Sequence, residues 1–471
     1  MNNTNPLYND TIIALATSSG VGAIAVIRLS GPEAIKKINR FFVSRSGKKD
    51  LTKVKSHTIH LGNIVEGERI IDEVLVSIFK NPHSYTGEDV AEISCHGSVY
   101  IQQEIIQLFL KNGVRHANPG EFTLRAFLSG KMDLSQAEAV ADLISSDSKA
   151  SHQIAMQQMR GGFSNEIENL RKQLLDFASL IELELDFAEE DIEFADRKQF
   201  LELVARIQKL LKSLIDSFAY GNVLKNGIPV AIVGEPNVGK STLLNALLND
   251  EKAIVSHIAG TTRDAIEDDM TIGGVTYRFI DTAGLRDTED HVEKIGIRKT
   301  YENIEKAQLV LHLMDAEQIQ NLTADKPGSK ISNKNLRNQY PDKEILTIIN
   351  KTDLLSEADH LKLKTQNPKL IFLSARNKTG IDVLIHKLTE LANTGILSNN
   401  QTIVSNSRHF EALNNALQAI TDVQRGMEQG VSSDLVAIDI REALYQLGLI
   451  SGAVTNEDLL GNIFQNFCIG K

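Results

Sequence analysis

The sequence predicts a multidomain chain with three parts: an α+β domain at the N-terminus, a discontinuous α-helical bundle, and an α/β P-loop domain of the Ras-like type inserted into that bundle. Three observations predict it. Residues 234–241 match the phosphate-loop pattern G-x-x-x-x-G-K-[ST] between an apolar run and a helix-like run. Helical periodicity fills residues 122–220 and returns after residue 408. Short apolar runs, broken by Gly, Asn and Pro, fill the first 120 residues, as is typical of strands.

Composition limits the classes of protein to consider. A chain of 471 residues, 42% of them hydrophobic, suits about three globular domains. The formal net charge of −11 gives no global basic field for nucleic acid. Two cysteines exclude a disulfide framework and fit a reducing compartment. The apolar stretch 11–29 follows an aspartate and contains glycines, so it predicts neither a signal peptide nor a membrane span, and a cytoplasmic location is expected.

The N-terminal α+β domain is predicted from its alternating elements. Strands are expected at 11–16, 23–29, 57–64, 73–79 and 90–94, with helices at 33–41 and 99–111. Arg28 and Glu92 each stand inside an apolar strand. An ionised side chain there points to solvent, forms a salt bridge or belongs to a ligand site, because burying it unpaired is costly.

The helical segments are expected to form one bundle. Residues 408–428 and 435–449 are amphipathic and lack a partner of their own, as do the helices of 122–220, so the two stretches are predicted to pack together. Ile181–Phe187 alternates like a strand but lies within a helical segment and is predicted as helix. Gly221 and Gly227 are the candidate joints before the P-loop domain. Its last helix is expected to end at Ala392, with a polar linker at 393–400.

The phosphate loop predicts a nucleoside triphosphate site. Its backbone N–H groups and the following helix N-terminus form an anion site. Lys240 is expected to reach the β- and γ-phosphates, and the Ser241 hydroxyl to hold Mg²⁺.

Three further motifs, each after a predicted strand, indicate guanine. Asp281–Gly284 would approach Mg²⁺ and the γ-phosphate, and Asn350–Asp353 would read the base. The Asp353 carboxylate can accept both N–H donors of the guanine edge, which adenine lacks. The Lys351 stem can cover the base, Asn350 can brace the loop, and the Ala375 N–H of the Ser374–Arg376 motif can donate to guanine O6. GTP is therefore the predicted nucleotide.

Motifs along almost the whole chain resemble one family. They are Gly22–Gly31, Ser84–Asp89, His96-Gly97, Pro119–Phe122, Asp133–Ala139, Ile258–Asp264, Asp281–Arg286 and Phe467–Lys471. In these motifs the chain is similar to the MnmE (TrmE) family of tRNA-modification GTPases. The resemblance implies an N-terminal folate-binding and dimerisation domain at 1–121, helical-domain parts at 122–222 and 394–471, the latter with the C-terminal Cys-Ile-Gly-Lys motif, and a GTPase domain at 223–393.

The resemblance also implies a folate site. Arg28, Glu92, Lys131 and Lys471 would bind 5-formyl- or methylene-tetrahydrofolate, because guanidinium and ammonium groups suit anions and a carboxylate can accept from pterin N–H donors. Cys468 would lie near the one-carbon unit as nucleophile or acid/base. The alternative for Cys468 is a buried structural thiol.

The GTPase site lacks a glutamine that would orient the attacking water, because Leu285 follows the Asp281–Gly284 motif. The resemblance implies that K⁺ takes the arginine-finger role. The K⁺ ligands would be Asn237, Ser256, Ile258 and Thr261, with Thr262 joining Ser241 at Mg²⁺ and Glu293 organising the water. Arg263 and Arg286 are the alternative fingers. Glu293, Lys240 and Cys468 are the expected catalytic residues. The expected GTP-binding residues are Asn237, Val238, Gly239, Lys240, Ser241, Thr242, Ser256, His257, Ile258, Ala259, Gly260, Thr261, Asp281, Thr282, Ala283, Gly284, Asn350, Lys351, Asp353, Ser374, Ala375 and Arg376.

The partners implied by the resemblance are a second copy of the chain, tRNA and the FAD-dependent MnmG (GidA), in a heterotetramer or larger complex. Together the two proteins would add an aminomethyl or carboxymethylaminomethyl group to C5 of the wobble uridine. A GTP-driven ribosome-assembly factor and a scaffold GTPase without folate chemistry are the alternatives. The sequence lacks a G-x-x-G loop in a basic setting, which a KH-type RNA module would supply.

Overall fold

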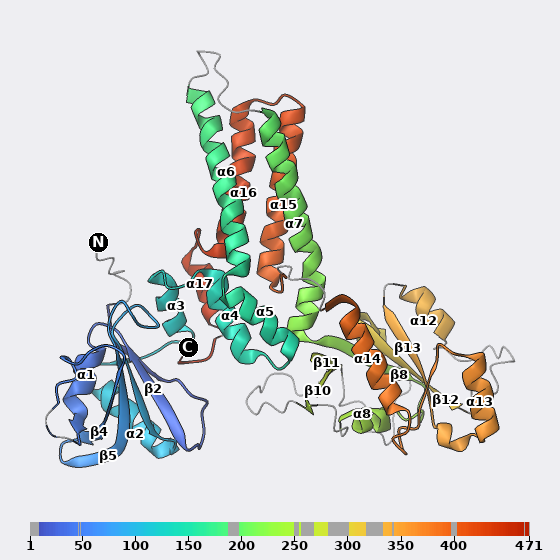
Figure 1. Cartoon of the computed structure of the whole chain (residues 1–471), viewed down its shortest axis with the longest axis horizontal. Coiled ribbons are helices and arrows are strands. Elements are labelled where there is room, and N and C mark those ends of the chain that lie inside the picture. Colours follow the sequence, from blue (N-terminus) through green and yellow to red (C-terminus); the bar gives the residue numbers. More distant parts are fainter. Residues whose placement is uncertain are drawn as a thin grey trace. The chain divides into compact units, whose positions relative to one another are not determined.

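The computed structural model describes residues 9–45, 47, 49–186, 197–248, 254–255, 268–280, 301–316, 333–341, 343–396, 403–465 and 467–470 (Figure 1). These residues belong to two compact units, which are treated separately here. Unit 1 comprises Met1–Ile144, Gln157–Leu211 and Ala412–Lys471, and unit 2 comprises Ser145–Met156 and Lys212–Glu411.

Unit 1 contains a mixed sheet covered by two helices. In its described residues the strand order is β3-β4-β5-β6-β2-β1-β7. Helices α1 and α2 contact this sheet, and their apolar residues join those of β2, β5 and β6 in one core. The predicted strands and helices of this region are confirmed. Their bounds are β1 Ile12–Leu15, β2 Ile24–Ser30, α1 Ala34–Phe41, β3 Phe42–Ser44, β4 Thr58–Glu66, β5 Arg69–Phe79, β6 Val90–His96, α2 Val99–Lys111 and β7 Arg115–His116.

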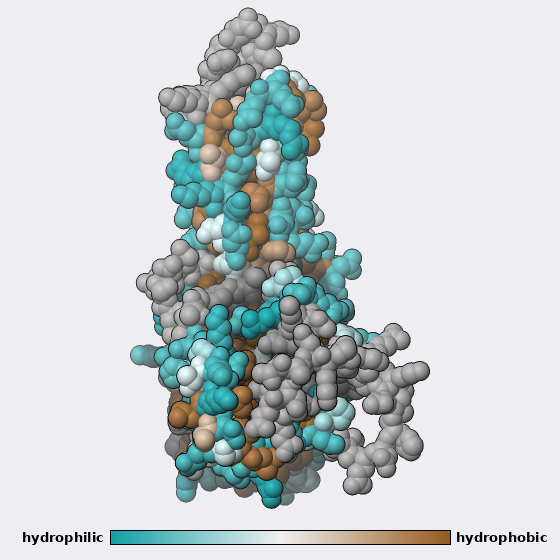
Figure 2. Space-filling model, turned by 90° about the vertical axis from the view of Figure 1, so that its right-hand side faces the viewer, coloured by the Kyte–Doolittle hydropathy of each residue, from teal (hydrophilic) through white to brown (hydrophobic). Residues whose placement is uncertain are grey.

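The predicted helical bundle is also confirmed. Within unit 1, α6 packs along α16, and Gln208 of α7 donates to the Gln424 side chain of α15 at 2.8 Å. Figure 2 shows hydrophilic residues over much of the outward surface of the bundle helices and a hydrophobic seam between them. The bounds are α3 Glu121–Leu128, α4 Leu134–Ser145, α5 Lys149–Met159, α6 Gly162–Asp186, α7 Arg197–Asn226, α15 Ser407–Glu428, α16 Ser433–Ser451 and α17 Glu457–Phe464.

Unit 2 contains a second mixed sheet, whose described strands have the order β14-β13-β12-β8-β11-β10-β9. The five strands β11, β8, β12, β13 and β14 run parallel. Their carboxyl ends therefore meet at one edge of the sheet. The bounds are β8 Ile228–Gly234, α8 Lys240–Leu248, β9 Ile254–Val255, β10 Asp268–Ile272, β11 Val275–Phe279, β12 Leu309–Asp315, α12 Asn333–Gln339, β13 Glu344–Asn350, α13 Glu357–Gln366, β14 Ile371–Phe372 and α14 Ile381–Ile396.

Some predicted boundaries are wrong. Gly221 lies inside α7, and a Cβ there would come 2.2 Å from the carbonyl oxygen of Val404. Close backbone approach, and not a joint between elements, explains this glycine. Gly227, with a φ of 83°, does separate α7 from β8. Helix α14 continues to Ile396, so the first four residues of the expected linker are helical. The alternating stretch from Ile181 is helical as predicted, up to Asp186 where α6 ends.

The start of α5 packs in unit 2 against the β10–β11 hairpin. The hairpin turns at two glycines with positive φ, and the Gly274 carbonyl accepts the Ala150 N–H at 3.2 Å. Helix N-termini have unpaired N–H groups, and this carbonyl satisfies one of them. The Thr276 hydroxyl also donates to Asp147 at 3.0 Å. In the sequence, the hairpin lies between the segment that follows the phosphate loop and the Asp281–Gly284 motif.

No helix in the described part of the chain combines the length and apolar character that a bilayer crossing needs.

Candidate functional site

The phosphate loop lies at the carboxyl edge of the unit 2 sheet, between β8 and α8. Its glycines are required by close contacts. A Cβ at Gly234 would lie 2.4 Å from the Leu313 carbonyl oxygen, and one at Gly239, whose φ is 92°, would lie 2.3 Å from the Asn350 Nδ2. Asn237, at the exposed tip, has a φ of 62°. The loop therefore packs closely against β12 and β13 while its tip stays open.

The Lys240 ammonium lies within this loop. Its Nζ donates to the carbonyl oxygens of Gly234 and Glu235, both at 3.0 Å. Burial lowers the pKa of Lys240, and a phosphate beside it would oppose that shift. Ser241 is the second residue of α8, so its hydroxyl lies at the same helix N-terminus. Loop, lysine and helix end together form an anion site of the kind that binds phosphates.

Asn350 joins the phosphate loop to both predicted base-reading motifs. Its side chain is 2% exposed, its Nδ2 donates to the Val238 carbonyl at 2.8 Å, and its Oδ1 accepts the Ala375 N–H at 3.0 Å. The expected bracing role thus acquires specific partners. The Ala375 N–H was expected to donate to guanine O6. In the structure it donates to Asn350 Oδ1 instead.

The base-reading loops also contact each other. The Ser374 hydroxyl donates to Asp353 Oδ1 at 2.5 Å, and Ser374 and Thr379 exchange two backbone hydrogen bonds that close the loop containing Ala375 and Arg376. Lys351 has a φ of 63° and its Nζ lies 2.7 Å from the Asp315 carboxylate. The phosphate-loop residues lie at the same edge, because Asn350 is hydrogen-bonded to Val238. The described residues of the expected GTP site therefore lie together, including Val238, Gly239, Lys240, Ser241 and Thr242.

Many expected site residues lie outside the described residues. They are Ser256, His257, Ile258, Ala259, Gly260, Thr261, Thr262, Asp281, Thr282, Ala283, Gly284 and Glu293 in the GTPase region, and Lys471 at the C-terminus.

Two side chains near the nucleotide edge were not singled out from the sequence. One is Asp315, at the end of β12. The other is His312, three residues earlier, which is 2% exposed and whose Nδ1 has no hydrogen-bond partner among the residues that the structure describes. Burial lowers the pKa of His312 to about 4, so the ring is neutral at neutral pH. The sequence did contain a signal for Asp315, because this acidic residue directly follows the apolar run of β12.

In unit 1, Arg28 and Glu92 pair directly. They face each other across β2 and β6, and the Arg28 Nε lies 2.8 Å from Glu92 Oε1. The guanidinium also lies 5.2 Å from the Tyr85 ring centre and 5.7 Å from that of Phe122. The sequence left three possibilities for these charges: exposure to solvent, a salt bridge or a ligand site. The structure shows the salt bridge, next to two aromatic rings. Lys131 is exposed, and a Cβ at Gly87, in the loop between β5 and β6, would lie 3.2 Å from Lys131 Cε.

The C-terminal tail reaches the same sheet. The Cys468 carbonyl accepts the Gly120 N–H at 3.5 Å, and a Cβ at Gly470 would lie 2.1 Å from the Leu15 carbonyl oxygen. Leu15 and its neighbour Ala14 pair with β2, where Ala14 is opposite Arg28. Cys468 is exposed, so the alternative of a buried structural thiol is wrong.

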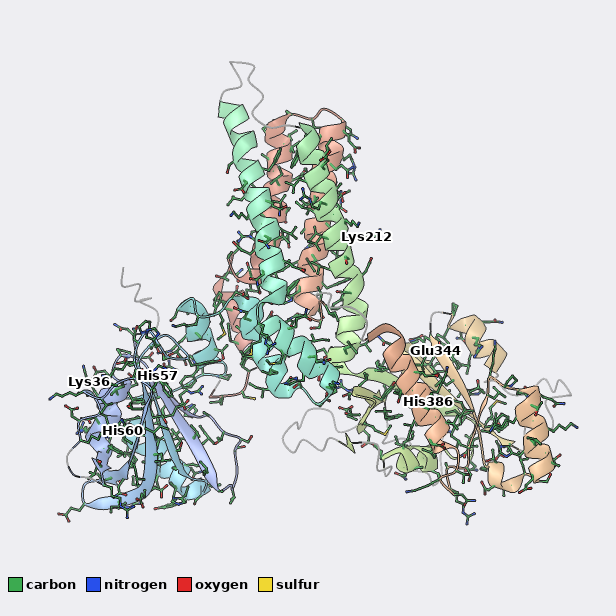
Figure 3. All side chains as sticks on the ribbon, in the orientation of Figure 1. Lys36, His57, His60, Lys212, Glu344 and His386 are labelled. Atoms are coloured by element: carbon green, nitrogen blue, oxygen red, sulfur yellow. The ribbon has the colours of Figure 1, made fainter. Side chains whose placement is uncertain are left out.

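A groove elsewhere in unit 2 is not part of the nucleotide edge. Glu344 and His386, both labelled in Figure 3, line a hollow of about 970 Å³ together with Lys369 and Asp382. Glu344 is the first residue of β13, so the groove lies at the amino ends of the parallel strands, opposite Asn350. Its position separates it from the phosphate loop.

Comparison with known proteins identifies the relatives of this chain. The family model of the MnmE helical domain matches residues 134–468, and that of the GTP-binding protein TrmE N-terminus matches residues 11–131. The chain is 63% identical to the tRNA modification GTPase MnmE of Flavobacterium johnsoniae, covering 99% of this chain and 100% of that protein. It is 50% identical to the protein of the same name from Cytophaga hutchinsonii, covering 98% of each.

Among solved structures, the G domain of the T. maritima FeoB iron transporter is similar over 35% of this chain and 99% of that domain, with 25% identity and a TM-score of 0.24. The full-length relatives and both family models lead to one assignment: this chain is a GTP-binding enzyme that belongs to the MnmE (TrmE) family of tRNA modification GTPases.

Proposed function

We propose that this GTPase, working in the cytoplasm as a homodimer with an FAD-dependent MnmG (GidA) partner, adds an aminomethyl or carboxymethylaminomethyl group to C5 of the wobble uridine of certain tRNAs. A reduced folate supplies the carbon, and K⁺ and Mg²⁺ support GTP hydrolysis. The proposed domains are residues 1–121 for folate binding and dimerisation, 122–222 and 394–471 for the helical domain, and 223–393 for the GTPase.

The observation that carries the folate part is the contact of residues 467–470 with the sheet of the N-terminal region. The tail that contains Cys468 lies against β1, one strand away from the Arg28–Glu92 pair and its aromatic neighbours. Folate has a flat ring with N–H donors and an anionic glutamate tail. Tyr85 and Phe122 offer apolar faces to the ring, Glu92 offers an acceptor, and Arg28 and Lys131 offer cations for the tail.

Binding of 5-formyl-tetrahydrofolate is the direct test of this proposal. Calorimetric titration of the full chain is expected to show one site per protomer, which the Arg28→Ala variant weakens about tenfold or more, because the charged group lost there is paired and partly desolvated. Arg45→Ala, at an exposed pair with Glu73 in the same domain, is the control and is expected to bind normally. A wild-type chain that does not bind the folate would favour a ribosome-assembly or scaffold GTPase.

The K⁺ part of the proposal rests on the phosphate loop. Leu285 cannot orient water, so a cation is needed beside the phosphates. Asn237 is exposed at the loop tip, and its left-handed backbone is one that asparagine tolerates well. Of the four proposed K⁺ ligands, Asn237 is the one that belongs to the described residues, and its carboxamide oxygen would bind the ion. Ser256, Ile258 and Thr261 are proposed to complete the shell, with Ser241 and Thr262 at Mg²⁺, Glu293 at the water and Lys240 at the phosphates.

GTP hydrolysis is expected to be faster in K⁺ than in Na⁺ by at least about tenfold and at most about 10³–10⁵, the factor that an arginine finger supplies elsewhere. Asn237→Ala should make the rate indifferent to the ion because it removes a ligand. Initial rates in matched KCl and NaCl measure this, with Asn222→Ala in α7 as control. Equal wild-type rates in both salts would contradict the K⁺ proposal while leaving the folate proposal intact.

An exposed apolar face of the unit 1 sheet supports the homodimer. Ile59 and Leu61 of β4, and Ile70 and Leu75 of β5, are 42–66% exposed, and Leu61 is opposite Leu75. Contiguous exposed apolar side chains on a strand pair favour contact with another protein surface.

Mass spectrometry of wobble-uridine nucleosides, in a deletion strain complemented with this chain, tests the tRNA part of the proposal.

A further inference from the structure

We propose that Asp315 is a positioning residue for guanine nucleotides, and that it acts by fixing the Lys351 side chain across the edge where the base binds. This inference deepens the proposed nucleotide site and depends on it. The observation behind it is the 2.7 Å contact between Lys351 Nζ and the Asp315 carboxylate.

The fold brings the pair together through strand register. Asp315 is the last residue of β12 and is opposite Asn350, the last residue of the parallel strand β13. Lys351 is the next residue, and its left-handed backbone, with a φ of 63°, turns the chain sharply at the end of the strand. Asn350 and its hydrogen bonds to Val238 and Ala375 hold that turn in place. The lysine therefore leaves the sheet from a fixed point, beside a carboxylate that is itself fixed by a strand.

The pair differs from an ordinary surface salt bridge. Lys351 is 34% exposed and Asp315 is 16% exposed, so the contact is partly shielded from water. Exposed lysine pairs contribute little because two long side chains must be ordered in water. Here only the lysine is long, and its ordering serves a second purpose. With the ammonium held at Asp315, we expect the four-carbon stem to lie over the nucleotide edge.

An ordered stem favours binding of the base. A free lysine would lose its rotamer freedom when it packs on a purine face, and that loss would weaken binding. Because Asp315 orders Lys351 beforehand, the cost does not fall on the binding step. Asp353, which would accept from the guanine edge, is separately engaged by Ser374 and does not need Lys351. Asp315 is thus predicted to act through Lys351 on the face of the base, and Asp353 on its edge.

The test is a double-mutant cycle on nucleotide dissociation from the full chain. Stopped-flow release of a fluorescent GDP is expected to be about tenfold faster in Asp315→Ala, a change equivalent to about 1.4 kcal/mol. In a Lys351→Ala background, the same Asp315→Ala change should have no further effect. IDP lacks the exocyclic amine but has the same ring face. The release of IDP should be accelerated by the same factor in Asp315→Ala. Asp353→Asn, in contrast, should change the ratio of the GDP release rate to the IDP release rate.

Controls separate positioning from general destabilisation. Asp315→Glu should restore much of the slow release, and Asp359→Ala in the neighbouring α13 should leave release unchanged. If Asp315→Ala lowers the melting temperature of the nucleotide-free chain, Asp315→Asn keeps the volume and serves instead. Unchanged release in Asp315→Ala, or an equal acceleration with and without Lys351, would overturn this inference alone. A wild-type chain that binds no GDP would overturn the nucleotide site as well.

Discussion

Replacing Asn350 with alanine is expected to weaken GDP binding by about a hundredfold or more. The side chain is almost fully buried and makes two hydrogen bonds, to Val238 in the phosphate loop and Ala375 in the base-reading loop. Leaving a buried donor or acceptor unpaired costs about 1–3 kcal/mol for each group. Two such losses amount to about 2–6 kcal/mol, and the middle of that range, about 4 kcal/mol, is more than two orders of magnitude in affinity when it falls on the nucleotide-bound arrangement.

Equilibrium titration with a fluorescent GDP measures this effect. Asn367→Ala is the matched control, because the Asn367 side chain caps α13 with one hydrogen bond to the Leu363 carbonyl and is remote from the phosphate loop in sequence and contacts. That variant should bind normally. A decrease in affinity of less than about threefold in Asn350→Ala, with the fold intact by circular dichroism, would show that water replaces the side chain and that the two loops are held together by other contacts.

The nucleotide site could be predicted from the sequence in outline but not in its contacts. Motif order and the strand before each motif were enough to predict a guanine-nucleotide edge, because each motif is local. The partners of Asn350 lie 112 and 25 residues away in the chain, and only the sheet order brings them together. For the same reason the Ala375 N–H was expected at the base. Asp315 was missed because its partner, Lys351, follows a different strand, which only the sheet order brings alongside.

The unit 1 site shows a similar division. Charged residues within apolar strands drew attention to Arg28 and Glu92, but their pairing depends on antiparallel register, which the sequence does not contain. A place for the tail at the folate site was expected only from family resemblance, and its contact with β1 was not predicted, since more than 450 residues separate Leu15 from Gly470. Gly221 was misinterpreted as a joint because the reason for a glycine, the close approach of Val404, is also a long-range contact. Local pattern predicts elements, and packing decides the site.

Replacing Arg125 with alanine is expected to destabilise unit 1 by about 3–5 kcal/mol, the usual cost of leaving buried charges unpaired. The Arg125 side chain is 2% exposed and pairs with Asp10 at 2.6 Å, Glu121 at 2.8 Å and Glu88 at 3.2 Å. It thereby ties α3 to the two loops that precede β1 and β6, at one end of the N-terminal sheet. Urea unfolding followed by far-ultraviolet circular dichroism measures the loss. Arg45→Ala, at an exposed pair with Glu73, is the control and should cost less than about 1 kcal/mol.

The acid dependence of this loss follows from the carboxylates. Burial opposes ionisation of Glu121, but hydrogen bonds from Arg115, the Asn118 N–H and Arg125 outweigh it and lower the pKa of Glu121 below its usual value near 4.5. A group whose pKa is lowered on folding contributes stability above its unfolded pKa and loses it as the pH falls through its folded pKa. The difference between wild type and Arg125→Ala should therefore be largest near pH 7 and shrink below about pH 4. A difference that stays constant down to pH 3 would mean that Arg125 stabilises α3 by packing and not by its charge.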